Sequence, residues 1–421
     1  MLTAQPSVAS AVPVSEGPAP LLSVVIPSYK RAMRLERSFR FHLKAFAEAK
    51  HPMEFVVFDN ASPDGTAEVV ADWMSTDPRI RHVRHKENRG FRPNFLSAFR
   101  GGRGKYLVYL ADDDLLIPEM IDKYVDRLEA DPSIGAIYAP WFLLDETKSS
   151  KIMGAAWTAD KEERFEPGDH AACLDFLLKH HAFPEIFIVR ADLVPETFST
   201  YCSVSYHYFT LLAHLLARTT VVFSHEPFMI VTAISRDSHV GNAETLYGWD
   251  EYRGGVEYLA SFCRTDGQPT YPDLPSLLQR IQGFTNTRMS VALRLHTGAR
   301  NWLVAWHLNR RLLAYNVQAI GRDIQAELSG LAAMEAIVLE YERAHVAEIV
   351  ACEKVFAMMR EVINVPAGIK LLCETDSDFE KHTTGGVRGY VTFNDVPLRP
   401  LREGDMALDL AAMMRRFEAP L

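Results

Sequence analysis

Three consecutive aspartates, Asp112, Asp113 and Asp114, end an apolar run in the segment VYLADDDLLIPEM. Adjacent like charges repel one another, and burial strengthens the repulsion because the surroundings screen it less. A divalent cation relieves this repulsion. Mg²⁺ and Mn²⁺ prefer oxygen ligands, typically one or two carboxylates together with phosphate oxygens of a bound molecule. The triplet therefore predicts a metal site that carries a diphosphate.

Other interpretations of the triplet are less favoured. Acidic residues ahead of a helix that begins at Pro118 would also complement its dipole, or could form a solvated loop. A calcium loop of the EF-hand type requires glycine at its sixth position, where this chain has Ile117. An aspartyl phosphatase motif requires threonine or valine where Leu116 stands. Because three acids at the end of a buried strand are uncommon, the metal interpretation is preferred.

Around the triplet, short apolar runs alternate with segments of helical composition. The runs predict strands at Leu21–Tyr29, Glu54–Asp59, Ile80–His85, Lys105–Ala111 and Ile134–Trp141. This alternation predicts an α/β fold with a mainly parallel sheet flanked by helices. In such sheets, ligands bind outside the carboxyl ends of the strands. Three polar clusters follow predicted strand ends there: Pro27–Tyr29, Asp59 with Asn60, and Asp112–Asp114.

The rest of the chain is less regular. Residues 145–167 read as a charged loop, and further elements are predicted as helix Asp169–His181, strand Glu185–Ala191, helix Tyr206–Ala217 and strand Thr219–His225. The alternation stops near Gly254. Residues 318–363 predict one or two long amphipathic helices, and GGVRGYVTFNDVPLRP predicts a small hairpin. The C-terminal region is therefore expected to be mostly helical.

The composition limits the class of protein. The 421 residues are 48% hydrophobic with a formal charge of -9, which is typical of a soluble globular protein and disfavours a nucleic-acid binder. Five cysteines without a CxxC pair argue against a zinc ribbon and suit a reducing compartment. Residues 1–20 contain no Lys or Arg and read as a disordered leader. We expect a cytoplasmic protein, with peripheral contact at the inner face of the membrane left open.

Four segments in order, SVVIPSYKR, EFVVFDNASPDGT, ENRGFRPNFLSAF and YLADDDLL, together resemble the nucleotide-sugar domain of family 2 glycosyltransferases. The resemblance covers about residues 21–245. It implies a GT-A fold and inverting transfer of a sugar from a nucleoside-diphosphate sugar to a hydroxyl of a glycan or lipid-linked acceptor. It also implies Mg²⁺ or Mn²⁺ at the aspartates.

The same resemblance assigns the donor-side residues. Those expected to bind the nucleotide sugar are Pro27, Ser28, Tyr29, Arg31, Asp59, Asn88, Gly90, Asn94, Asp112 and Asp113. Within the triplet, Asp112 would touch the ribose or sugar and Asp114 would coordinate the metal, with Asp112 as a further metal ligand. Asp113 could carry either role. The segment ISRDSHVGN resembles a late element that completes the metal or diphosphate site, which nominates His239.

The catalytic base departs from the family pattern. Relatives carry an acidic pair at a helix start, but the corresponding stretch CSVSYHYFTLLAHLLA has no carboxylate. His207 is the group there whose pKa suits a base, although it could equally be a packing residue. Asp145, Glu146 and Glu185 are alternatives. Because this acid is missing, a second hypothesis is a scaffold protein that binds nucleotide sugars without catalysis. A third hypothesis is a sugar nucleotidylyltransferase.

Three regions are expected from this reading. Residues 1–20 form the leader, 21–250 the GT-A catalytic domain, and 251–421 a mostly helical domain for acceptor binding or oligomerisation. The long C-terminal helices could pack internally or form a homodimer.

Overall fold

The computed structural model describes residues 19–148, 150–194, 206–235, 249–265, 267–271, 273–394, 397 and 399–417. The leader expected at residues 1–20 falls almost wholly outside these ranges. The chain divides into two compact units. The first comprises residues 1–242 and 250–284, and the second comprises residues 243–249 and 285–421. Each unit is described separately.

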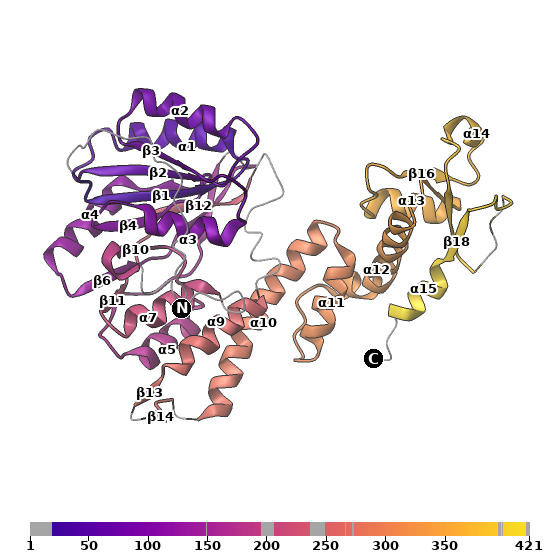
Figure 1. The fold of residues 1–421 in the computed structure, drawn as a ribbon. Helices are drawn as coiled ribbons and strands as arrows, with labels where there is room; N and C mark the ends of the chain where they lie inside the picture. Colours follow the sequence, from indigo (N-terminus) through magenta and orange to yellow (C-terminus); the bar gives the residue numbers. More distant parts are fainter. Residues whose placement is uncertain are drawn as a thin grey trace, which may run out of the picture. The chain divides into compact units, whose positions relative to one another are not determined.

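The first unit is built on a mixed sheet whose strands run in the order β3-β2-β1-β4-β10-β6-β11-β9 (Figure 1). Its strands are β1 (Leu22–Ser28), β2 (Met53–Asp59), β3 (Ile80–Arg84), β4 (Tyr106–Tyr109), β6 (Ile134–Tyr138), β9 (Glu163–Phe165), β10 (Phe187–Arg190) and β11 (Thr220–Phe223). The four strands β1 to β4 are parallel, whereas β10 runs antiparallel to both β4 and β6. The predicted α/β architecture with a mainly parallel sheet is confirmed.

Helices cover both faces of this sheet, as Figure 1 shows for α1 and α2 on one side and α3 on the other. The helices of the unit are α1 (Ala32–Ala45), α2 (Thr66–Thr76), α3 (Phe91–Gly101), α4 (Pro118–Ala130), α5 (His170–His180), α7 (His207–Leu216) and α9 (Trp249–Ser261). The strands β1 and β2 are apolar and almost completely buried between them. The connections through α1 and α2 lead from β1 to β2 and then to β3, whereas the connection through α3 leads back to β4 on the other side of β1. Because crossovers between parallel strands are right-handed, a connection that runs in the opposite direction along the sheet places its helix on the opposite face.

A second, four-stranded sheet has the order β5-β12-β7-β8. It comprises β5 (Leu115–Leu116), β12 (Met229–Ile234), β7 (Phe142–Asp145) and β8 (Lys151–Ala155). The strand predicted at Ile134–Trp141 is present as β6 but ends at Tyr138, ahead of Pro140. The loop predicted at residues 145–167 was wrong, because this segment contains β8 and β9. The exposed β8 lacks an apolar pattern of its own and is formed by pairing with β7.

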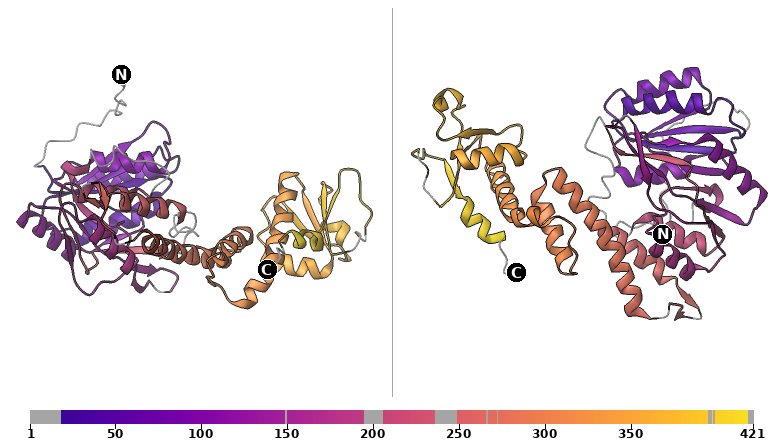
Figure 2. Two further views of the ribbon diagram at one scale, coloured as in Figure 1. Left: turned by 90° about the horizontal axis from the view of Figure 1, so that it is seen from below. Right: turned by 180° about the vertical axis from the view of Figure 1, so that it is seen from behind.

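The second unit combines helices with a small parallel sheet (Figure 2). Its helices are the C-terminal part of α10 (Leu274–Gly298), α11 (Trp302–Leu313), α12 (Arg322–Arg343), α13 (Glu353–Val362), α14 (Phe379–His382) and α15 (Leu410–Phe417). The strands β15 (Glu348–Ala351), β16 (Lys370–Cys373), β17 (Arg388–Thr392) and β18 (Met406–Asp409) run in the order β16-β15-β17-β18. The region is mostly helical as predicted, but this sheet was not foreseen.

One finer prediction for this unit was wrong, and another was incomplete. The hairpin expected in the tail is absent from the described residues, because β17 and β18 pair in parallel. Of the one or two long helices predicted over residues 318–363, α12 and α13 are present, but the prediction missed β15 between them. Each of these strands has only four or five residues, which is too short for a periodic pattern to be clear.

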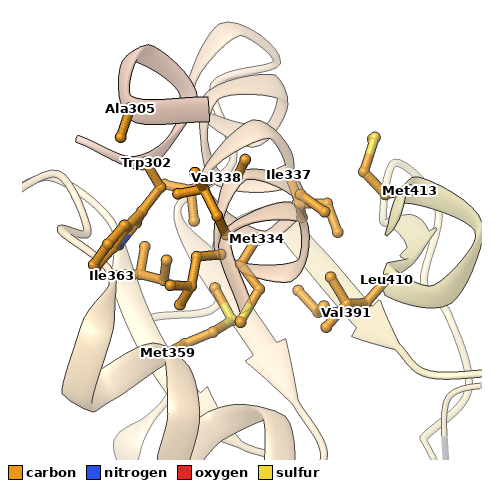
Figure 3. Packing of buried hydrophobic residues seen from close by; sticks show 14 of the residues in the cluster. Trp302, Ala305, Met334, Ile337, Val338, Met359, Ile363, Val391, Leu410 and Met413 are labelled. Atoms are coloured by element: carbon orange, nitrogen blue, oxygen red, sulfur yellow. The ribbon is translucent and has the colours of Figure 1, made fainter. Parts of the chain in front are cut away.

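The core of the second unit joins its helices to the sheet. Trp302, Met334, Met359, Val391 and Leu410 are buried together and come from α11, α12, α13, β17 and α15 (Figure 3). A cavity of about 680 Å³ lies among α11, α12, α13 and α15, with Trp306, Met334, Met358 and Met414 among its walls. Across the described residues, no helix is long and apolar enough to cross a bilayer.

Candidate active site

The polar clusters predicted from strand ends meet where the order of the large sheet reverses. β1 lies between β2 and β4, so the chain leaves β1 in one direction and returns to its other side with β4. Such a reversal opens a crevice at the carboxyl ends of the strands. Ser28, the last residue of β1, donates a hydrogen bond from its Oγ to Asp112 Oδ2 at 2.9 Å. The predicted convergence of these two clusters is therefore present.

The aspartate triplet is largely buried and is partly neutralised by two arginines of α1 and its N-cap. Asp112 and Asp114 are 5% and 6% exposed. Arg31 Nε lies 3.9 Å from Asp112 Oδ1, and Arg34 forms an ion pair with Asp113. Sequence analysis missed Arg34. Its place three residues after Arg31, on the same face of a helix that follows β1, is the signal that could have found it.

This compensation is incomplete at Asp112. Burial, together with the charge of Asp113, raises the pKa of its carboxyl to about 6, although Arg31, Arg34 and the hydrogen bond from Ser28 act in the opposite direction. A buried carboxyl whose charged form is disfavoured is a good partner for an additional cation, because the cation restores the balance.

Asp114 offers the second carboxylate. Its Oδ1 accepts a hydrogen bond from the backbone N–H of Thr232 at 2.9 Å. Within the described residues, no three His, Cys, Asp or Glu side chains are grouped as a complete metal site. His239 lies outside the described residues. Mg²⁺ commonly takes only one or two protein carboxylates and completes its shell with phosphates and water. The oxygen donors of Asp112 and Asp114 therefore fit such a cation.

Asp59 at the end of β2 is completely buried and surrounded by donors. Its Oδ1 accepts the N–H of Ser62 at 2.8 Å, and its Oδ2 lies 3.2 Å from Arg84 Nε and 3.6 Å from His82 Nε2. Burial raises the pKa of Asp59, but the nearby His82 ring and the hydrogen bond from Ser62 outweigh it and hold the pKa below its usual range. Asp59 is thus a charged acceptor. It lies beside Ser28, because the two residues are partners in the parallel pairing of β1 with β2.

The segment that contains Asn88, Gly90 and Asn94, predicted to approach the sugar nucleotide, is hydrogen-bonded to the carboxyl end of β2. Asn60 Nδ2 donates to Asn88 Oδ1 at 2.9 Å and to the carbonyl of Gly90 at 3.0 Å. Gly90 has φ of 83°, a backbone conformation that favours glycine. Asn94 is buried, and its Nδ2 donates to the carbonyl of Phe58 at 2.9 Å. Asn88 and Gly90 thus lie close to Asp59, whereas the Asn94 amide supports β2 from α3.

Pro27 and Tyr29 flank Ser28 and are half-buried. The residue that follows, Lys30, has φ of 58°, and its N–H donates to Ser62 Oγ at 3.0 Å. This bond joins the loop after β1 to the loop after β2. Pro27 and Tyr29 therefore stand at the same edge as Asp59.

His207 begins α7 and is 7% exposed. Its ring centroid lies 4.7 Å from that of Phe95 and 4.0 Å from that of Tyr208. Burial, assisted by the charge of Arg92, lowers the pKa of His207 to about 3. The ring is therefore neutral at neutral pH, and as a base it has a low proton affinity.

The carboxylate alternatives differ in their surroundings. Glu185 accepts a hydrogen bond from the Tyr206 hydroxyl at 2.8 Å, one residue before α7 begins. Asp145 is completely buried, and its Oδ1 accepts the N–H of Thr147 at 2.9 Å. Glu146 follows it, with its N–H bonded to the carbonyl of Ile234 at 2.9 Å. Of these, Glu185 is the one linked to the start of α7.

Comparison with known proteins identifies a family match within the first unit. The family model described as Glycosyl transferase family 2 matches residues 23–195, which include β1 to β4 and the aspartate triplet. Residues 23–195 match the family 2 glycosyltransferases. This confirms the resemblance seen in the four sequence segments.

The matches to curated relatives cover only a part of this chain. Chondroitin synthase of Escherichia coli is 24% identical over 180 residues, which span 43% of this chain and 24% of that protein. A putative teichuronic acid biosynthesis glycosyltransferase of Bacillus subtilis, TuaG, is 28% identical over 108 residues, 25% of this chain and 41% of that one. The chain thus spans well under half the length of these relatives.

Two solved structures match this chain with TM-scores below 0.5. Staphylococcus aureus TarS 1–349 in complex with UDP-GlcNAc gives a TM-score of 0.46 at 14% identity, covering 77% of this chain and 87% of that one. The mannosyltransferase PcManGT of Pyrobaculum calidifontis, in complex with GDP-Man and Mn²⁺, gives 0.43 at 19% identity, covering 76% and 88%.

Proposed function

We propose that the protein is an inverting glycosyltransferase that moves a sugar from a nucleoside-diphosphate sugar to a hydroxyl of a glycan or lipid-linked acceptor. The observation that carries the proposal is the gathering of Ser28, Asp59, Asp112 and Asp114 at one edge of the sheet, inside the family 2 segment. A buried acid with incomplete charge compensation at a strand-order reversal suits a cation and a diphosphate.

The donor would lie across the ends of β1, β2 and β4. Pro27 and Tyr29 would border the nucleobase, and the charged carboxylate of Asp59 would accept a hydrogen bond from a base N–H. Arg31 has a side chain that is 32% exposed and lies near Asp112 and Asp113, so it can turn toward a diphosphate. Asn88 and Gly90 would approach the sugar side, where glycine allows close backbone contact.

Asp112 and Asp114 would hold the Mg²⁺ or Mn²⁺, with His239 as a further predicted ligand. A cation bound there supplies positive charge that stabilises the leaving nucleoside diphosphate. Asp113 is the least available of the three acids for this task, because it is paired with Arg34 and its carbonyl accepts a hydrogen bond from Thr232.

Inversion requires a base that takes the proton of the acceptor hydroxyl as the hydroxyl attacks the anomeric carbon. His207 remains the proposed base, with its neutral ring able to receive a proton. Glu185 is the alternative, since the Tyr206 hydroxyl connects it to the residue that precedes His207. Replacement of each residue separately distinguishes the two, as set out below.

A screen of nucleotide sugars by thermal unfolding, with and without Mn²⁺, tests the donor site. Binding to the folded state raises its stability with the logarithm of ligand saturation. We expect one UDP- or GDP-sugar to raise the unfolding temperature in the presence of Mn²⁺ and to have little effect with EDTA. No shift with any donor would contradict the proposal.

A second candidate is a nucleotide-sugar-binding scaffold without catalysis. The low pKa of His207 and the absence of a carboxylate in α7 favour it. Slow release of nucleoside diphosphate from the preferred donor separates the candidates, because only an enzyme hydrolyses the donor in the absence of acceptor.

Three further features of the proposal concern the setting of the reaction. We infer a cytoplasmic location, peripheral contact with the inner face of the membrane, and a homodimer through the C-terminal helices. Cell fractionation tests the first two, and light scattering of the purified protein tests the third.

A further inference from the structure

The segment Ala111–Leu116, called here the aspartate loop, follows β4, contains the whole triplet and ends with β5. One internal bond, from Asp114 N–H to the carbonyl of Ala111 at 3.1 Å, closes a turn within it. A single turn does not determine where the carboxylates of Asp112 and Asp114 point. Contacts from other elements must therefore fix the loop.

The first such contact comes from β12. Thr232 Oγ1 donates to the carbonyl of Asp113 at 2.6 Å, and Thr232 N–H donates to Asp114 Oδ1 at 2.9 Å. The antiparallel register of β12 with β5, in which Ile230 faces Leu115, brings Thr232 opposite Asp113. Thr232 is 4% exposed, so water competes little for these bonds. One residue thus holds both the loop backbone and a carboxylate oxygen.

The second contact comes from α1. His42 Nε2 accepts the N–H of Leu116 at 3.1 Å, and His42 Nδ1 lies 2.8 Å from the carbonyl of Ser38. A proton on Nδ1 for Ser38 leaves the lone pair on Nε2 for Leu116, so both bonds require the same tautomer. The ring is 1% exposed and packs between Phe46 and Phe55. Burial lowers the pKa of His42 to about 4, which keeps this acceptor available near neutral pH.

We propose that Thr232 and His42 are positioning residues that together clamp the aspartate loop and so orient Asp112 and Asp114 toward the cation and diphosphate. The inference rests on the proposed function of this site. Groups that orient metal ligands from behind typically account for 10- to 100-fold in metal affinity or activity. Loss of either contact is therefore expected to weaken cation binding while the chain remains folded.

A matched pair of variants tests the β12 contact. Thr232→Val is similar in shape and keeps the backbone N–H, but it loses the hydroxyl that bonds Asp113. Thr232→Ser retains that hydroxyl. We expect Thr232→Val to raise the Kd for Mn²⁺ in the presence of UDP or GDP by about tenfold, and Thr232→Ser to stay within about twofold of wild type. Electron paramagnetic resonance of free Mn²⁺ measures this affinity.

A second pair tests the α1 contact. His42→Phe keeps an aromatic ring but has no acceptor for the Leu116 N–H, whereas His42→Gln retains an acceptor oxygen. We expect His42→Phe to weaken Mn²⁺ binding by about tenfold and His42→Gln to retain most of the wild-type affinity for Mn²⁺. Thermal unfolding of each variant separates the roles, because a purely structural residue would lower the unfolding temperature and leave the Mn²⁺ affinity of the folded protein unchanged. If His42→Phe does not fold, the Thr232 pair decides.

The two possible failures are distinct. Mn²⁺ binding by wild type, with equal affinity in Thr232→Val and His42→Phe, would overturn the clamp and leave the proposed function intact. A wild-type protein that binds no Mn²⁺ with either nucleotide would contradict the proposed function and the clamp together.

Discussion

The two compact units each contain parallel strands whose order turns back on itself, and each has buried charged residues at a strand end. In the first unit the order β3-β2-β1-β4 places Ser28 and Asp59 at the carboxyl ends of β1 and β2. In the second, the order β16-β15-β17-β18 places Glu348 and Arg388 at the amino ends of β15 and β17.

The acids also differ in how well their charge is compensated. Glu348 accepts hydrogen bonds from Thr383 and Thr384 and pairs with Arg388 at 3.0 Å. Burial raises its pKa, but these bonds outweigh it and lower the pKa to about 2, whereas burial raises the pKa of Asp112 to about 6. The strand order offers a crevice in both units. The crevice of the first unit differs because it contains Asp112, a buried acid whose charge is incompletely compensated. We therefore assign the donor to that crevice.

Replacement of Asp114 should have the largest effect on transfer. Asp114→Asn removes the charge that would hold the cation, which contributes several kcal/mol to the transition state, so we expect about a thousandfold loss of turnover. Asp409→Asn is the matched control at the carboxyl edge of the second unit, where its carboxylate accepts the N–H of Ala412 at 2.7 Å. Steady-state rates should fall only in the first variant. Undiminished transfer by Asp114→Asn at saturating donor would rule out its role.

The next largest effect concerns the base. Loss of a general base typically costs about a hundredfold or more in kcat, so His207→Ala should lose that much if His207 takes the proton. Glu185→Gln is the matched variant for the alternative. Wild-type rates in His207→Ala with a large loss in Glu185→Gln would move the assignment to Glu185.

Acidity should change cation affinity by about tenfold per pH unit. The pKa of Asp112 is raised to about 6, so its carboxyl is charged above that value and protonated below it. Mn²⁺ affinity should therefore be constant above pH 6 and fall as the pH decreases through 6. Calorimetric titration of Mn²⁺ between pH 5 and 8 (about the range in which proteins are most stable) measures this. In Asp112→Asn the affinity should be weak and nearly independent of pH.

The smallest effect on transfer is expected for Glu348→Gln, which should change stability instead. Removing one partner of a buried ion pair costs about 3 kcal/mol. Because the folded pKa of Glu348 is lowered from 4.5 to about 2, its contribution is complete above pH 4.5 and is lost as the pH falls toward 2. Denaturant unfolding should show this loss in wild type but not in the variant. A changed donor affinity in Glu348→Gln would contradict the separation of roles between the two units.

Much of the first unit was predictable because its central strands are continuous apolar runs. β1 and β2 bury nearly every residue, so their composition alone marks them as strands of a covered sheet. The exposed β8 and the short β15 to β18 carry no such pattern. They exist because of their pairing partners, and the parallel pairing of β17 with β18 could not be told from a hairpin by composition.

Site residues that follow directly from the ends of strands could be predicted from the sequence. Site residues that depend on contacts between distant parts of the chain could not. Ser28, Asp59 and Asp112 follow from the carboxyl ends of strands. Thr232 and His42 reach the aspartate loop from 119 and 74 residues away in the sequence, and no local pattern indicates such contacts. The aromatic surroundings of His207 likewise come from α3 and α7 together, so its low pKa was not foreseen.

Release of nucleoside diphosphate from UDP- and GDP-sugars by the purified protein, in Mn²⁺ and in EDTA, tests the central claim most directly. The account predicts slow, Mn²⁺-dependent hydrolysis of at least one donor by wild type and none by Asp114→Asn. Hydrolysis that is absent with every donor, or equal in the two proteins, would contradict it.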